Sequence, residues 1–148
     1  MQYTMKTFDE LTNRELYRLL ALRQEVFVIE QTCIYPDLDG KDETAYHLMA
    51  VEDEKLVGGL RILGRGAVFE EVSIGRVVVS APNRGRGIAK EMMQRALGFI
   101  ESELQEKCVK ISAQTYAIAF YEGLGFRSVS KEYLEDGIPH VDMVCRLT

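Results

Sequence analysis

The stretch that decides the fold of this chain is Val77-Val-Val-Ser-Ala-Pro-Asn-Arg-Gly-Arg-Gly-Ile-Ala89. It begins with an apolar run, which is typical of a strand that is covered on both faces. It then passes through Gly85 and Gly87 into residues whose apolar side chains recur at helical spacing. The stretch therefore predicts a buried strand, a tight turn and a long helix in immediate succession.

The glycine turn predicts an anion site built from main chain. The first N–H groups of a helix have no partner inside the helix and carry a partial positive charge. Gly85 and Gly87 lack the side chains that would keep an anion away from these groups. We therefore expect phosphate oxygens to bind the amides of residues 84–89, with Arg84 and Arg86 adding charge. The plain alternative is a tight loop without a ligand.

The turn does not match the common nucleotide-binding motifs. A P-loop needs Gly-Lys-Ser/Thr after a four-residue gap, and no such sequence is present. The dinucleotide fingerprint GxGxxG is incomplete, and the turn lies in the middle of the chain rather than in an opening βαβ unit.

On the C-terminal side of the turn, a helix is expected from Ile88 to about Lys107. Its apolar positions predict one buried face: Ile88, Met92, Met93, Ala96, Leu97, Ile100 and Leu104. A strand at Val109–Ala113, a short helix at Ala117–Glu122 and two strands at Arg127–Tyr133 and His140–Leu147 follow.

On the N-terminal side, a helix is expected over residues 11–27, where Thr12 and Glu15 form a capping box. A polar loop over residues 33–42 follows. The strands His47–Val51 and Lys55–Leu63 are joined by a turn at Asp53-Glu54, and a third extended stretch runs from Val68 to Val79. The order of elements predicts a mixed α/β sheet in a single domain of residues 1–148, with helices on both faces.

Composition limits the classes of partner. The net charge is -5, which gives no basic footprint for nucleic acid or for an anionic membrane and is weakly compatible with a cationic acceptor. Three scattered cysteines suit free thiols in a reducing compartment, and no apolar run is as long as a membrane span. We expect a cytoplasmic protein that is a monomer or a homodimer.

A metal site is not expected. The segment from Asp37 to Asp42 resembles part of a calcium loop, but Leu48 stands at the twelfth position, where a bidentate glutamate is needed.

Two motifs resemble one enzyme superfamily. Residues 84–89 resemble the Q/R-x-x-G-x-G/A motif of the GCN5-related N-acetyltransferases (GNAT), and residues 119–126 resemble the second signature, a helical tyrosine followed by Gly-Phe. Residues 23–31, 35–42, 75–77 and 135–140 further resemble the ElaA-type subfamily. The resemblance implies the GNAT fold, with a mostly antiparallel twisted sheet. It also implies direct acetyl transfer from acetyl-CoA to a primary amine in a ternary complex, without a metal.

The resemblance also implies roles for single residues. The main chain of the strand before the turn would pair with the pantetheine arm of coenzyme A, and the turn would hold its pyrophosphate. The residues concerned are Val77, Val78, Val79, Arg84, Gly85, Arg86, Gly87, Ile88 and Ala89. Gln114 stands near a polar position that contacts the cofactor. Tyr121 would be the general acid beside the cofactor sulfur, the alternative being an ordinary packed aromatic residue.

This chain departs from the family pattern at the position of the general base. Several members carry a glutamate where this chain has Ser73. Glu71 would lie on the same strand face by alternation, and His47, His140 and Asp136 are other candidates, as is proton loss to bulk water.

For the acceptor we expect contacts from Glu30, Tyr35, Asp37 and Asp136, with Asp39 and Asp42 helping to attract a cation. Cys33 has no adjacent base that would make it a nucleophile.

Two other functions stay open. One is a non-catalytic module that binds or senses acyl-CoA, which the absence of an acid at Ser73 favours. The other is an acyltransferase that uses another acyl chain or another acceptor, such as an alcohol.

Overall fold

The computed structural model describes residues 1–148 and contains eight strands and three α-helices. Their bounds are β1 Gln2–Thr7, α1 Asn13–Arg23, β2 Tyr46–Glu52, β3 Lys55–Leu63, β4 Ser73–Val79, α2 Ile88–Ser102, β5 Cys108–Gln114, α3 Ile118–Glu122, β6 Phe126–Ser128, β7 Tyr133–Glu135 and β8 Ile138–Arg146. A π-helical segment, η2 Gln24–Glu30, continues α1.

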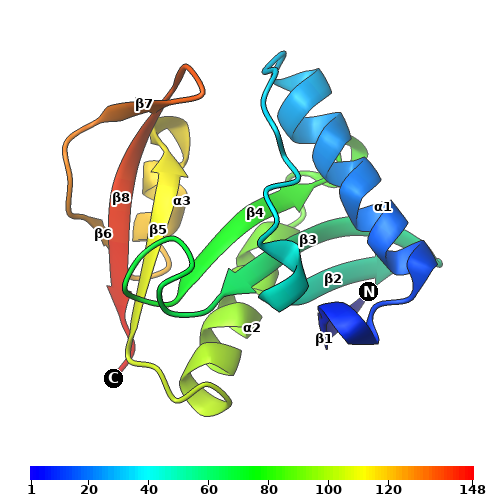
Figure 1. Cartoon of the computed structure of the whole chain (residues 1–148), viewed down its shortest axis with the longest axis horizontal. Coiled ribbons are helices and arrows are strands. Elements are labelled where there is room, and N and C mark those ends of the chain that lie inside the picture. The colour runs from blue at the N-terminus through cyan, green and yellow to red at the C-terminus, as the bar shows by residue number, and fades with distance from the viewer.

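The strands form two antiparallel sheets that touch at one point. The first sheet has the order β1-β2-β3-β4, and the second has the order β5-β8-β6 with β7 beside β8. A single parallel bridge between Val72 and Val109 joins them, where the amide of Lys110 donates to the carbonyl of Val72 at 3.0 Å. Beyond this bridge β4 and β5 diverge, and an opening widens toward the C-terminal end of both strands (Figure 1).

The helices α1 and α2 cover opposite faces of the first sheet. Gly58 faces the side chain of Met92 on α2, and the next residue, Gly59, faces Leu19 on α1. Because successive strand residues point to opposite faces, the two helices lie on different sides (Figure 1). The predicted mixed α/β fold with helices on both faces is therefore confirmed.

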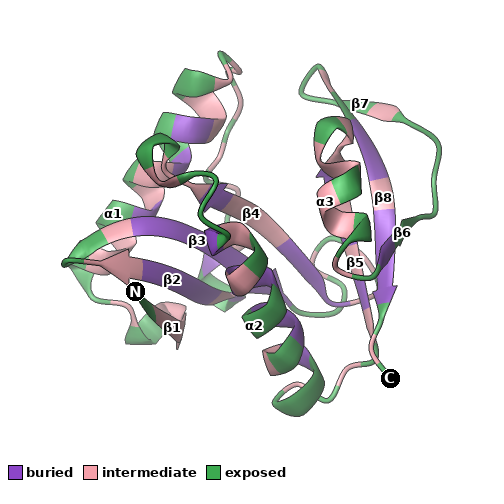
Figure 2. Ribbon diagram, turned by 180° about the vertical axis from the view of Figure 1, so that it is seen from behind, coloured by how far each residue is buried: buried purple, intermediate pink, exposed green.

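The core lies between α2 and the two sheets. Met92, Met93, Ala96 and Ile100 are completely buried, as their spacing predicted (Figure 2). They pack with buried residues of both sheets in one apolar cluster. Burying each large apolar side chain contributes roughly 1.5–3 kcal/mol, so this face fixes α2 against the strand that leads into it.

Local signals in the N-terminal half predicted two features correctly. The amide of Glu15 donates to the hydroxyl of Thr12 at 3.1 Å, and the amide of Thr12 donates to Glu15 at 2.9 Å, which completes the capping box. Asp53 and Glu54 have φ of 50° and 63°, the conformation of a two-residue hairpin turn between β2 and β3.

Several predicted boundaries were wrong. Strand β1 was missed because its side chains are only half-buried at the edge of the sheet, which leaves no clear apolar alternation. The stretch before Ser73 bends instead of extending, and α2 ends at Ser102 rather than near Lys107. The strand expected over residues 127–133 divides into β6 and β7, because the chain leaves β8 after Ser128 and returns at Tyr133.

No helix in the structure combines the length and the apolar character needed to cross a membrane. Cys33, Cys108 and Cys145 form no disulfide.

Candidate functional site

The glycine turn presents unpaired main-chain donors. Gly85 and Gly87 have φ of 77° and 78°, a left-handed conformation that only glycine adopts without strain. Gly87 caps α2 without any side-chain hydrogen bond, and the first bond of the helix runs from Glu91 to its carbonyl at 3.0 Å. The amides of residues 85–89 donate to no protein group. They can therefore donate hydrogen bonds to an anion at the positive end of α2.

A cavity of about 530 Å³ opens directly above this turn. We call it the turn cavity. The turn, β4, η2 and α3 line it, through residues that include Val77, Val78, Val79, Arg84, Gly85, Gly87, Ile88, Ala89, Phe120 and Tyr121. Most of the residues expected to contact coenzyme A thus share one hollow.

Only one of the two turn arginines belongs to the turn cavity. Arg84 forms a two-pronged ion pair with Glu30 at 2.7 and 3.0 Å and donates to the carbonyl of Val79. Arg86 turns away and pairs with Glu52 at 2.6 Å. Hydrogen bonding from Arg84 lowers the pKa of Glu30. Glu30, expected at the acceptor, lies instead at the turn cavity, because η2 carries it to Arg84.

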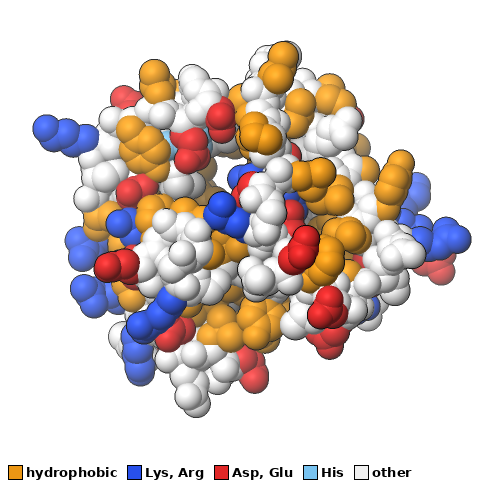
Figure 3. All heavy atoms as spheres, in the orientation of Figure 1, with side chains coloured by type: hydrophobic (Ala, Val, Ile, Leu, Met, Phe, Trp, Pro, Cys, Tyr) orange, Lys and Arg blue, Asp and Glu red, His pale blue; other side chains and the backbone are white.

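A second, more polar cavity of about 590 Å³ lies on the other side of the opening. We call it the polar cavity. Figure 3 shows the molecule hollowed in this region, with charged side chains around the rim. The two cavities share the lining residues Phe27, Gln31, Val77, Tyr116, Ala117 and Tyr121. They therefore meet where β4 and β5 diverge.

Tyr121 stands at this junction with its hydroxyl unbonded. Its ring packs edge-on against Phe120 and Phe126, with centroids 5.1 and 5.8 Å away. Burial, with a smaller contribution from Tyr116, raises the pKa of Tyr121 to about 12. The ring is thus a packed aromatic, while the phenol stays protonated at neutral pH and can donate a hydrogen bond at the junction.

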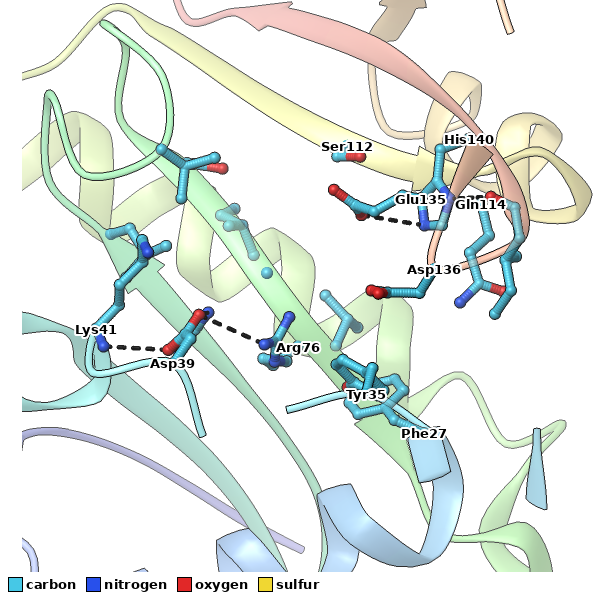
Figure 4. Close-up of a pocket in the computed structure, with 18 of the residues that line it drawn as sticks. Phe27, Tyr35, Asp39, Lys41, Arg76, Ser112, Gln114, Glu135, Asp136 and His140 are labelled. Atoms are coloured by element: carbon cyan, nitrogen blue, oxygen red, sulfur yellow. Dashed lines mark hydrogen bonds and ion pairs between the residues drawn. The ribbon is translucent and has the colours of Figure 1, made fainter. Parts of the chain in front are cut away.

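His140 is the histidine that reaches the polar cavity. Its Nδ1 lies 2.6 Å from the carbonyl of Ile138, so Nδ1 carries the hydrogen and Nε2 is the basic nitrogen of the neutral ring. Nε2 lies 3.5 Å from Glu135 (Figure 4). The antiparallel register of β5 and β8 places His140 opposite Gln114, at the end of β5.

Gln114 lines the polar cavity rather than the turn cavity. Its side-chain amide faces that of Gln31 at 3.4 Å, across the opening. The residue expected to touch the cofactor therefore lies on the polar-cavity side of the place where the two cavities meet.

Two of the base candidates lie away from both cavities. His47 is buried in β2, where Nε2 lies 2.9 Å from the carbonyl of Asp42, and burial lowers its pKa. Glu71 precedes β4, so the prediction that strand alternation places it on the same face as Ser73 was wrong. Its carboxylate lies near the charge of Arg65. Neither residue lines the turn cavity or the polar cavity, whereas Ser73 lines the polar cavity.

A buried to half-buried cluster of three arginines and three aspartates, called the buried cluster below, fastens the 33–42 loop to α1 and the first sheet. Arg23 contacts Asp37 and Asp42, each at 2.8 Å. Arg61 contacts Asp39 at 2.6 Å and Asp42 at 3.1 Å. Hydrogen bonds from Arg61 hold the pKa of Asp39 far below its usual range. The pKa of Asp42 is also lowered: burial raises it, but the hydrogen bonds and charges of Arg23 and Arg61 outweigh that effect.

Asp37, expected to attract the acceptor, belongs to this cluster and does not line the polar cavity. Its carboxylate accepts from Arg23 and from the hydroxyl of Tyr35 at 2.7 Å, and Nε of Arg76 lies 2.8 Å from Oδ1 as an ion pair without hydrogen-bond alignment. Tyr35 does line the cavity, as does Asp136. Asp136 occupies the β7–β8 turn with φ of 51°.

Sequence reasoning missed other residues of the polar cavity. Arg76 and Lys41 line it. The one local signal for Arg76 was its own charge within the otherwise largely apolar sequence of β4. Ser112 also lines the polar cavity, and behind the lining its hydroxyl lies 2.5 Å from that of Tyr133, which donates to Asp142 at 2.6 Å. No sequence pattern signals this chain of groups, since β5, β7 and β8 bring it together.

Cys33 also lines the polar cavity, and its thiol lies 3.5 Å from the carbonyl of Asp136. No base accompanies it. No group of three or more His, Cys, Asp or Glu side chains is arranged to hold a metal ion.

Known proteins match the chain along almost its whole length. The model of the acetyltransferase (GNAT) domain family matches residues 10–147. Protein ElaA of Escherichia coli is 40% identical over 137 residues, which are 91% of this chain and 90% of the relative. The crystal structure of an acyl-CoA N-acyltransferase from Pseudomonas aeruginosa has a TM-score of 0.90 at 42% identity and covers 98% of this chain and 99% of that one. The crystal structure of E. coli ElaA has a TM-score of 0.91 at 37% identity and covers 97% and 98%.

Proposed function

The chain belongs to the GNAT acetyltransferase family, and from this premise we propose that it transfers an acetyl group from acetyl-CoA directly to a primary amine. The observation that carries the proposal is the junction at Tyr121. On one side lies a cavity with unpaired amides for a phosphorylated ligand, and on the other a polar cavity of about 590 Å³ for an acceptor. Such a junction suits a ternary complex, in which proximity supplies much of the rate acceleration.

The chain's own groups fit coenzyme A. The amides of residues 85–89 and the guanidinium of Arg84 would bind its pyrophosphate. Val77 and Val79 lack strand partners on the side toward β5. The carbonyl of Val79 accepts from Arg84, and the main-chain groups that stay unpaired would pair with the pantetheine arm. We assign no coenzyme A contact to the side chains of Arg86 and Gln114, because neither residue lines the turn cavity.

Acyl transfer needs a proton acceptor for the amine and a donor for the departing sulfur. Nε2 of His140 takes a proton from the amine nitrogen as the C–N bond forms, and Glu135 stabilises the resulting imidazolium. The C–S bond then breaks, and the phenol of Tyr121 donates a hydrogen bond to the thiolate. Because its pKa of about 12 exceeds that of an ordinary thiol, about 8.5, hydrogen bonding is favoured over full proton transfer.

A thiol-release assay with acetyl-CoA and a panel of primary amines tests the proposal. Tyr121→Phe keeps the packed ring and removes the hydroxyl, so we expect kcat to fall by about 10²-fold or more with nearly unchanged coenzyme A affinity by calorimetry. Tyr17→Phe, at an exposed position of α1, is the matched control. His140→Gln removes the proposed proton acceptor, so it should also lower kcat/KM.

The alternative is a module that binds acyl-CoA without catalysis. Ser73 favours it, because that position carries no acid. Coenzyme A binding by the wild type without thiol release from any amine would support this alternative, and a rate unchanged by Tyr121→Phe would remove Tyr121 from the mechanism.

A further inference from the structure

The charged side chains of the polar cavity are sorted between two walls. One wall consists of the 33–42 loop with β3 and β4, and it carries Lys41, Arg61 and Arg76 together with Asp39, which pairs with Arg61. The other wall is the β7–β8 hairpin, and it carries Glu135 and Asp136 (Figure 4). The asymmetry matters because two opposite charges held apart in a cavity select a ligand that carries both.

The loop wall has an excess of positive charge. The three arginines of the buried cluster are balanced by its three aspartates, Asp37, Asp39 and Asp42. Lys41 is not balanced, since its ammonium group forms no ion pair and no side-chain hydrogen bond, although it lines the cavity. Its charge is therefore available to a ligand.

Arg76 adds a positioned donor on the same wall. Its Nη2 donates to the carbonyl of Asp37 at 3.0 Å and lies 3.4 Å from Asp39, and its guanidinium lies 5.5 Å from the ring centre of Tyr35. Nη1 has no partner in the protein and is not sealed from solvent. The cluster thus holds the guanidinium in place and leaves one nitrogen for a ligand.

The hairpin wall has an excess of negative charge next to the reacting end of the cavity. The carboxylate of Asp136 has no partner, and Glu135 faces only His140. His140 lies opposite Gln114, and Tyr121 lines the same cavity. An amine drawn to this wall would therefore arrive beside the groups proposed for catalysis.

We propose that the acceptor is an amine that also carries a carboxylate, with the amino group at the hairpin wall and the carboxylate bound by Lys41 and Nη1 of Arg76. This inference rests on the proposed function, because it specifies the acceptor of the same site. It assigns specificity to two residues of the loop wall that take no part in proton transfer.

Matched amines test the inference. 4-Aminobutyrate and 6-aminohexanoate are compared with butylamine and hexylamine, and with the neutral amides of both amino acids. Binding is measured by calorimetry in the presence of coenzyme A, and thiol release from acetyl-CoA is measured separately. We expect at least one amino acid to bind about tenfold more tightly than its matched amine and its amide, and to have a correspondingly higher kcat/KM.

Lys41→Gln should remove most of that preference, because it should lower kcat/KM for the amino acid much more than for the simple amine. Because the Lys41 side chain forms no hydrogen bond or ion pair, and its backbone amide keeps its bond to Asp39 in the variant, the variant should fold normally. Lys131→Gln, at an exposed position outside both cavities, should leave the preference unchanged. Asp136→Asn should weaken the binding of the amino acid and of the simple amine to the same extent.

The outcomes separate this inference from the proposed function. Equal binding and equal kcat/KM for amino acid, amide and amine would overturn the inference and leave acetyl transfer standing. A preference that Lys41→Gln does not change would also overturn it. Selective binding of the amino acid without thiol release would support the inference and contradict the proposed function, and the absence of both binding and turnover would overturn both.

Discussion

At the scale of single residues, the ion pair of Glu30 and Arg84 sets the charge of the turn cavity. Both side chains line it, and they contact each other at 2.7 Å. Glu30→Gln removes a negative charge from the turn cavity, so the guanidinium of Arg84 becomes free to bind a phosphate group. We therefore expect severalfold tighter coenzyme A binding by calorimetry, with a larger gain at low salt because the pair is exposed.

Glu52→Gln is the control for this prediction. It removes an equivalent partner from Arg86, which does not line the turn cavity. Equal effects of the two substitutions would mean that net charge, rather than the Arg84 contact, governs binding.

At the scale of elements, the glycine turn between β4 and α2 has a backbone conformation that strains other residues, and it also gives a ligand access to the unpaired amides. Gly87→Ala places a side chain at φ 78° with no atom within 4 Å, so conformation alone should cost about 1–2 kcal/mol of stability. The new methyl group would also occupy space in the turn cavity, which Gly87 lines. We expect a lower urea midpoint and weaker coenzyme A binding.

Gly98→Ala provides the matched control in the same helix. Gly98 lies in the middle of α2 with its surface exposed to solvent, and a Cβ atom added there would have no other atom within 4 Å. Its φ is that of an ordinary helix, so alanine should stabilise the protein by up to about 1 kcal/mol. Coenzyme A binding should not change. A stability gain from both substitutions would contradict the left-handed requirement at Gly87.

At the scale of the whole molecule, buried charges make stability depend on pH. Burial lowers the pKa of His47, so the unfolded chain binds a proton below about 6.5 that the folded chain excludes. The carboxyl groups of Asp39 and Asp42 also have lowered pKa values, so their contribution is present above about 3.8 and is lost as the pH falls further.

We therefore expect the free energy of unfolding, measured with urea, to fall from pH 7 to pH 5 and more steeply below pH 4. His47→Gln should flatten the first decline and leave the second. A wild-type stability that is constant between pH 7 and pH 5 would contradict the assignment to His47.

The sequence by itself determined the turn, the helix that follows it and the resemblance to the family. These features are local: the φ values of Gly85 and Gly87, the unpaired amides and the apolar face of α2 all depend on neighbouring residues. The same locality explains why the capping box and the β2–β3 turn were predicted correctly, and why the half-buried edge strand β1 was not.

Only the tertiary structure decided which residues form the polar cavity. His47 and His140 look alike as strand residues, but β2 buries the first against Asp42, and the β5–β8 register carries the second to the polar cavity. Asp37 and Lys41 both lie in one polar loop, yet arginines from α1 and β4 neutralise the aspartate and leave the lysine unpaired. The physical reason is that burial and charge pairing depend on partners far apart in the chain, and their positions follow from sheet register and helix packing.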